Sequence, residues 1–196
     1  MNIITEALPE TVKVDGRVFF INSDYRVMIR FEKRMQDRRL DDARKVSDTL
    51  RDFYKGEIPE DITKAWMEMI RFYLMGGELP TDEKSEKRRG LQQTSVYDWE
   101  VDSAYIFGAF YSQYGIDLNE TEHMHWWKFL SLFKSLNSDN KIVEIMGYRA
   151  TDLSKIKDDA ERQRIANLQH IYAIPTNYTK EEKASIIGAV FSGGFR

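Results

Sequence analysis

Residues 125–136 read HWWKFLSLFKSL and combine two adjacent tryptophans with a regular apolar pattern. One helical face of this stretch carries Trp126, Phe129, Leu130, Phe133 and Leu136. So large an apolar face has to be covered by other parts of the chain, which predicts a core helix. Trp127 projects about 100° away, at the edge of that face. Its indole suits either packing on a neighbouring subdomain or an exposed protein interface, and both interpretations stay open.

Helical patterns lie on both sides of this stretch. Apolar spacing predicts further helices over residues 25–35, 43–54, 62–74, 98–114, 139–146 and 158–172. Asn119 to Glu122 matches a capping box and predicts the start of the helix that carries Trp126. Asp15-Gly16 lies between apolar residues of Val12 to Ile21, which predicts a β-hairpin. The expected fold is mainly α, a bundle-like helical domain with one N-terminal hairpin.

Composition shifts suggest four regions along the chain. Residues 1–78 hold the hairpin and the first helices, and residues 79–94 form a charged linker. Residues 95–175 are the aromatic-rich helical region, and residues 176–196 are a C-terminal amphipathic helix and tail. We expect all four to belong to one compact domain.

The overall composition excludes several classes of function. The 196 residues carry a formal net charge of -3, which argues against sequence-independent binding of nucleic acid. The sequence contains no cysteine, which excludes disulfides and thiolate chemistry and fits a reducing cytosol. No apolar run approaches the roughly 20 residues that a membrane span needs, so we expect no membrane partner.

Candidate catalytic and metal-binding residues are few. His123 and His125 are two apart, and on the predicted helix they would lie roughly 200° apart, too far to share one ion. Asp98 and Asp102 would share a helical face, where a solvated or salt-bridged stripe is the expected role. The sequence lacks the common phosphate-loop, zinc-protease and serine-hydrolase motifs. We therefore expect no catalytic residue, cofactor or metal.

Protein interaction is the expected activity, and five residues are candidates for it: Trp127, Tyr148, Arg149, Ile187 and Phe191. Gly147-Tyr148-Arg149 resembles a helix end followed by an exposed aromatic residue and a cation, with either a structural or a binding role. Ile187 and Phe191 lie on the predicted C-terminal amphipathic helix.

Three blocks of sequence carry a family resemblance. They read DxxxDxxYIxxAFxxxYGIDL from Asp98, HWWKFLxLFxxL from His125 and KIxxIMxYR from Lys141. Together they resemble the bacteriophage "gene product fifteen" family, proteins similar to tail-assembly chaperones in long-tailed phages and prophages of Gram-positive bacteria. The resemblance covers most of Leu8 to Pro175 and leaves residues 176–196 unmatched.

The resemblance implies a chaperone in the host cytoplasm that binds the tape-measure protein and keeps it soluble during tail assembly. A structural virion subunit of the tail or connector is the alternative. A metal-dependent enzyme using Asp98, Asp102 and a histidine is a distant one. The resemblance also leaves open self-association and a longer product, made by a -1 frameshift near Gly193-Gly194-Phe195. An ordinary chain end is the simpler interpretation of that stretch.

Overall fold

The computed structural model describes residues 2–77 and 96–174, which form two compact units. Unit 1 contains residues 2–77 and 123–131, and unit 2 contains residues 96–122 and 132–174. Within these ranges the protein has seven α-helices and one two-stranded sheet, which confirms the mainly α prediction. Residues 123–131 come after the first segment of unit 2 in sequence but pack with the N-terminal helices of unit 1. The predicted linker 79–94 and tail 176–196 lie outside the described residues.

The hairpin forms where the sequence predicted it. Strands β1 (Thr11–Val14) and β2 (Arg17–Phe20) pair antiparallel. Asp15 and Gly16 both adopt positive φ angles, 48° and 80°. Two positive φ angles define a type I′ turn, and its twist matches that of the flanking strands.

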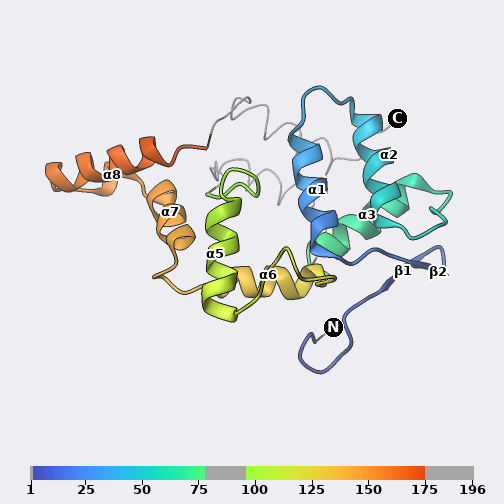
Figure 1. The fold of residues 1–196 in the computed structure, drawn as a ribbon. Coiled ribbons are helices and arrows are strands. Elements are labelled where there is room, and N and C mark those ends of the chain that lie inside the picture. Colours follow the sequence, from blue (N-terminus) through green and yellow to red (C-terminus); the bar gives the residue numbers. More distant parts are fainter. Residues whose placement is uncertain (1, 78–95, 175–196) are drawn as a thin grey trace. The chain divides into compact units, whose positions relative to one another are not determined.

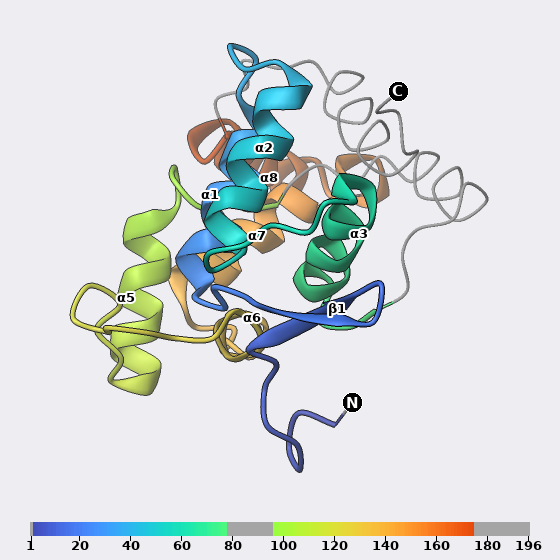
Figure 2. The same cartoon turned by 90° about the vertical axis from the view of Figure 1, so that its right-hand side faces the viewer.

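Three helices follow in unit 1: α1 (Tyr25–Gln36), α2 (Asp42–Phe53) and α3 (Ile62–Tyr73). Each begins directly after an aspartate whose carboxylate accepts a backbone N–H of the first turn. Figures 1 and 2 show α1 and α2 side by side, joined by a short loop. Asp61 is the N-cap of α3, and Pro59 lies two residues before it.

The tryptophan pair attaches helix α6 (Trp126–Lys134) to the end of α3. The Trp126 indole N–H donates to the Tyr73 carbonyl at 2.9 Å, and that of Trp127 donates to the Phe72 carbonyl at 2.7 Å. Carbonyls in the last turn of a helix lack the usual i+4 donor. The Trp126 indole donates to the Tyr73 carbonyl, and the Phe72 carbonyl accepts both the Trp127 indole and the Met75 N–H at 3.0 Å. Trp127 is only 3% exposed. The expectation of an exposed edge at Trp127 is therefore wrong, and the core interpretation holds.

The chain reaches α6 through a short extended segment that pairs with the entry to α1. Trp126 N–H donates to the Ser23 carbonyl at 2.7 Å, and Tyr25 N–H donates to the Met124 carbonyl at 2.9 Å. The Asp24 carboxylate accepts both the Arg26 N–H of α1 and the Met124 N–H. Residues about 100 positions apart thus share one hydrogen-bonded junction.

The predicted capping box at Asn119 is wrong. Asp117 accepts the backbone N–H groups of Asn119 and Glu120, which closes a local turn several residues before α6. The residue that caps α6 is His125, whose Nδ1 accepts the Trp127 N–H at 3.1 Å. Asx-type turns compete with helix starts for the same side chains, so the sequence pattern alone did not separate them.

Unit 2 contains α5 (Ser103–Tyr114), α7 (Lys141–Ala150), the 3-10 helix η1 (Leu153–Lys155) and α8 (Asp159–Ile171). Helix α7 packs against both α5 and α8. Helix α5 begins five residues later than predicted, after a turn at residues 99–102. It ends at Gly115, whose φ of 64° gives a left-handed cap. Helix α7 runs four residues past the predicted end at residue 146, so Gly147-Tyr148-Arg149 lies within its last turn and does not follow it.

Replacing Phe129 by alanine tests the importance of the α6 core. The Phe129 ring is buried and stacks on Tyr25, with ring centroids 4.3 Å apart. We expect Phe129→Ala to lower the free energy of unfolding by about 3–5 kcal/mol, the usual cost of such a cavity. Urea unfolding followed by tryptophan fluorescence measures it. Phe20→Ala is the matched control, since that ring is exposed. Equal effects of the two substitutions would contradict the core assignment.

Candidate functional site

The two histidines that suggested a metal site each have a structural partner. His123 Nε2 lies 3.2 Å from Ser23 Oγ, which itself donates to Glu10. His125 Nε2–H donates to the Pro9 carbonyl at 3.1 Å. Both histidines precede α6, so the helical geometry assumed from the sequence does not apply to them. Among residues 2–77 and 96–174, no group of three or more His, Asp or Glu side chains could hold a metal ion.

The protonation state of His125 follows from its two hydrogen bonds. A carbonyl only accepts, so Nε2 carries the proton, while Nδ1 accepts the Trp127 N–H and must be unprotonated. Burial lowers the pKa of His125 below its usual value of 6.5. The Pro9 hydrogen bond and the nearby Glu10 act in the opposite direction but less strongly. His125 is therefore a neutral capping residue.

Asp102 and Arg149 form a buried ion pair inside unit 2. Arg149 Nη1 and Nη2 donate to the two carboxylate oxygens at 2.6 and 2.9 Å, and both side chains are almost completely buried. The same guanidinium donates to the carbonyls of Val96 and Tyr172. Arg149 thus joins the start of α5 to the end of α8. The salt-bridge interpretation of Asp102 is confirmed, and the Asp98 carboxylate instead accepts backbone N–H groups of the following turn.

The five predicted interaction residues do not meet on one surface. Trp127 is in the core of unit 1, and the Arg149 side chain is buried in unit 2, so the expectation of an exposed cation is wrong. Tyr148 is half-buried, stacks on Tyr172 and lies under the Lys141 ammonium. Ile187 and Phe191 lie outside the described residues.

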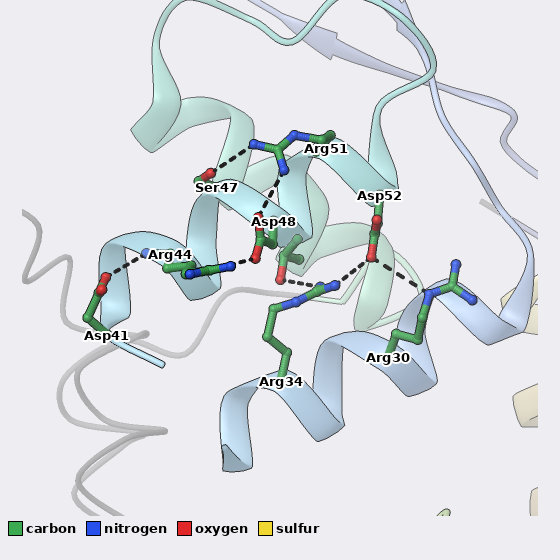
Figure 3. Close-up of polar contacts among 9 residues, drawn as sticks. Arg30, Arg34, Asp41, Arg44, Ser47, Asp48, Arg51 and Asp52 are labelled. Carbon is green, nitrogen blue, oxygen red and sulfur yellow. Dashed lines mark hydrogen bonds and ion pairs between the residues drawn. The ribbon is translucent and has the colours of Figure 1, made fainter. Parts of the chain in front are cut away.

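An arginine-rich polar network lies between α1 and α2 (Figure 3). Four arginines surround two aspartates: Arg30, Arg34, Arg44 and Arg51 around Asp48 and Asp52. Asp52 Oδ2 lies 2.6 Å from Arg34 Nη2 and 3.7 Å from Arg30 Nε. Asp48 accepts from Arg51 at 3.0 Å. The contacts of Arg30 and Arg34 with Asp52 join α1 to α2, whereas the Asp48 pairs lie within α2. The Arg44 and Arg51 side chains are largely exposed, so their pairs contribute little stability each.

One exposed apolar surface lies on the hairpin. We call it the hairpin face, made of the cross-strand pairs Thr11–Phe20 and Lys13–Val18. Val18 is 58% exposed and Phe20 66%, whereas Phe19 between them is buried. The charged side chain of β2 lies on its other side, where the Arg17 guanidinium covers the Phe19 ring and pairs with Glu57 at 3.0 Å. Exposed apolar groups that lie together are typical of protein-binding surfaces.

A second exposed surface runs along α5. We call it the α5 face: Val101, Ala104, Tyr105, Gly108, Tyr111 and Ser112. The opposite side of the helix is buried through Ile106, Ala109 and Phe110. The sequence of α5 contains no charged residue, although one side of the helix is exposed. Sequence periodicity marked both surfaces as apolar but did not show which sides the rest of the protein covers.

The described residues contain no helix long and apolar enough to cross a membrane. Comparison with protein families gave one match, in which the model described as Bacteriophage Gp15 protein covers residues 4–174. This chain belongs to the Bacteriophage Gp15 protein family. Searches of curated proteins and of solved structures gave no match.

Membership of the Gp15 family indicates a phage structural or morphogenesis protein. The family match spans both compact units and ends at the last described residue, which agrees with the extent of the resemblance seen in the sequence. The hairpin face and the α5 face both lie within the matched residues, as do the buried contacts of His125 and Arg149.

The lowered pKa of His125 predicts a pH-dependent stability of this Gp15-family protein. The unfolded chain takes up a proton on this histidine near pH 6.5, whereas the folded protein does so only at lower pH. The contribution of neutral His125 to the free energy of unfolding is therefore fully present above pH 6.5. It declines as the pH falls below that value. We expect His125→Asn, which keeps a capping acceptor, to weaken this decline between about pH 7.5 and 5.5. Urea unfolding across that range measures it, and an unchanged pH slope would contradict the assignment.

Breaking the buried ion pair should strongly destabilise unit 2. Asp102→Asn leaves the Arg149 guanidinium buried without a counter-charge, which costs about 3–5 kcal/mol. The control is Glu161→Gln in the exposed pair with Arg164, which should barely change the melting temperature. Thermal unfolding followed by circular dichroism compares them. Equal melting temperatures of the two variants would contradict a stabilising role for the buried Asp102–Arg149 ion pair.

Proposed function

We propose that this protein is a tail-assembly chaperone that binds the tape-measure protein through the hairpin face. The observation that carries the proposal is the exposed pair Val18 and Phe20 on a Gp15-family protein. Both side chains lie on one face of a strand whose other face packs inward through Phe19. An exposed apolar pair on a folded scaffold provides binding area at little entropic cost.

The chemistry of the face suits an apolar helical client. A tape-measure protein presents long apolar stripes that would aggregate if left bare, and Val18 with Phe20 offers a matching apolar contact. Lys13 and Thr11 lie directly across the sheet from Val18 and Phe20, and their polar groups flank the apolar centre. A small contact of this kind binds reversibly, and a chaperone has to release its client when the tail tube forms.

We also propose that the protein acts without catalysis, a cofactor or a metal. This is supported by the contacts that already engage the candidate chemical groups. His125 caps α6, and Asp102 is paired with Arg149. The host cytoplasm is the proposed location, because assembly of the tail takes place there.

Co-expression with the tape-measure protein of the same phage tests the function. We expect wild-type protein to increase the soluble fraction of the client and to be recovered with it in pull-downs. The double variant Val18→Ser, Phe20→Ser should bind at least about tenfold more weakly, because each lost apolar contact is worth about 1.5–3 kcal/mol.

The matched control is Ile171→Ser on α8, another exposed apolar side chain in the other unit. It should leave client binding unchanged. Failure of wild-type protein to bind the tape-measure protein would overturn the chaperone proposal. Stoichiometric presence in purified virions, measured by mass spectrometry, would support the structural-subunit alternative instead.

A further inference from the structure

Helix α5 has the one entirely uncharged sequence, SAYIFGAFYSQY, among the described helices. Its exposed side is the α5 face, on which Tyr105 is 39% and Tyr111 59% exposed. Surface helices of soluble domains normally carry charged residues on the side away from the core. The side of α5 away from its buried residues carries two aromatic rings and small residues instead.

Gly108 lies at the middle of the α5 face, and no contact among the described residues requires a glycine there. A Cβ atom added there would meet nothing within 4 Å, and the backbone does not have a positive φ angle. Glycine in a helix interior costs about 1 kcal/mol relative to alanine. Among the described residues, neither crowding nor backbone conformation requires this glycine, and the same is true of Gly147 on α7. What distinguishes Gly108 is its place at the centre of an uncharged exposed face, where the missing side chain would let another helix approach closely.

The α5 face is nearly symmetric about Gly108. Tyr105 and Tyr111 lie three residues before and after it, and the small residues Ala104 and Ser112 lie four before and after. A surface that matches itself in this way is what a two-fold axis requires, because both copies use the same patch. The pattern therefore favours a second copy of the chain over an unrelated partner.

We propose that two copies of the protein pair through α5, antiparallel, with Gly108 facing Gly108 of the partner subunit at a two-fold axis. About 5 Å from this axis, Tyr111 of one helix meets Ala104 of the partner subunit. Ser112 meets Tyr105 of the partner subunit at the same level. Each ring thus packs over a small side chain, and the glycines let the helix backbones approach.

The physical chemistry of the pair fits this geometry. Neither helix brings a charge into the contact, so no ionised group has to be desolvated. The tyrosine hydroxyls can stay at the wet rim while the rings are covered. The antiparallel order places the positive end of each helix dipole beside the negative end of the other.

The expected affinity is modest. One pair of 12-residue helices buries less than the standard interface of about 1,200–2,000 Å². We therefore expect a dissociation constant on the order of tens of micromolar. This proposal goes beyond the chaperone function and does not depend on it, because the hairpin face is a separate surface.

Sedimentation equilibrium of the full chain, from about 1 to about 200 μM, tests the pairing. We expect a monomer–dimer equilibrium in the wild type and a monomer throughout in Gly108→Glu, which brings two carboxylates together at the axis. Gly147→Glu on α7 is the matched control, since that glycine is also mid-helix with nothing within 4 Å of an added Cβ. It should still form the dimer, and melting curves should show both variants folded.

Single cysteines give a second, independent measurement, because the natural chain contains none. Gly108→Cys should form a disulfide-linked dimer under mild oxidation, and Gly147→Cys should not. Ala104→Cys alone should stay monomeric, since the antiparallel order separates its two copies by about 12 Å, beyond the reach of a disulfide. A mixture of Ala104→Cys and Ser112→Cys should cross-link.

Three results would overturn the proposal. The first is a monomeric wild type whose Gly108→Cys variant forms no disulfide. The second is equal cross-linking at positions 108 and 147, which indicates random collision. The third is dimers of Ala104→Cys alone, which indicate a parallel pair. A monomeric wild type whose Gly108→Glu variant loses only tape-measure binding would assign the α5 face to the client instead.

Discussion

Unit 1 depends on two hydrogen bonds that the adjacent indoles of Trp126 and Trp127 donate to the carbonyls of Tyr73 and Phe72. Both carbonyls belong to the last turn of α3; Trp126 donates to that of Tyr73, and Trp127 adds a second donor to that of Phe72, which also accepts the Met75 N–H. Each indole hydrogen bond also fixes a large ring in the core, where Trp126 stacks on Tyr73 and Trp127 packs against Phe72. A segment more than fifty residues downstream in the chain thereby completes the N-terminal helices. Truncating either tryptophan would leave a cavity in the core, and truncating Trp126 would also remove the indole donor of the Tyr73 carbonyl.

Unit 2 is organised by a polar interaction of the same kind. Arg149 uses one guanidinium to hold the start of α5, the segment at Val96 and the end of α8. Tryptophan and arginine are common in binding sites, but here they donate to groups inside the protein. The tryptophan pair donates to carbonyls in unit 1, and Arg149 donates to carbonyls and a carboxylate in unit 2. The exposed apolar groups include two adjacent side chains on one face of the hairpin and an uncharged face on α5. These two surfaces are the ones on which the proposed contacts rest.

The sequence predicted the helices and the hairpin well, because local spacing and the Asp-Gly turn decide them. It did not predict the roles of Trp127 and Arg149, since burial depends on contacts with residues that lie far away in the chain. The start of α6 was also misplaced, because Asn119 to Glu122 looks like a cap while His125 performs that role. The hairpin face was missed for a related reason. Alternation places Val18 and Phe20 together, but only the packing of Phe19 shows that they are the exposed side.

The central claim is that the tryptophan segment maintains the fold while the hairpin face binds the client. Hydrogen–deuterium exchange of the full chain, with and without the tape-measure protein, tests this most directly. The account predicts slow exchange over residues 123–131 in both states, and new protection over residues 11–20 when the client is present. New protection confined to residues 123–131, with the hairpin unchanged, would contradict it.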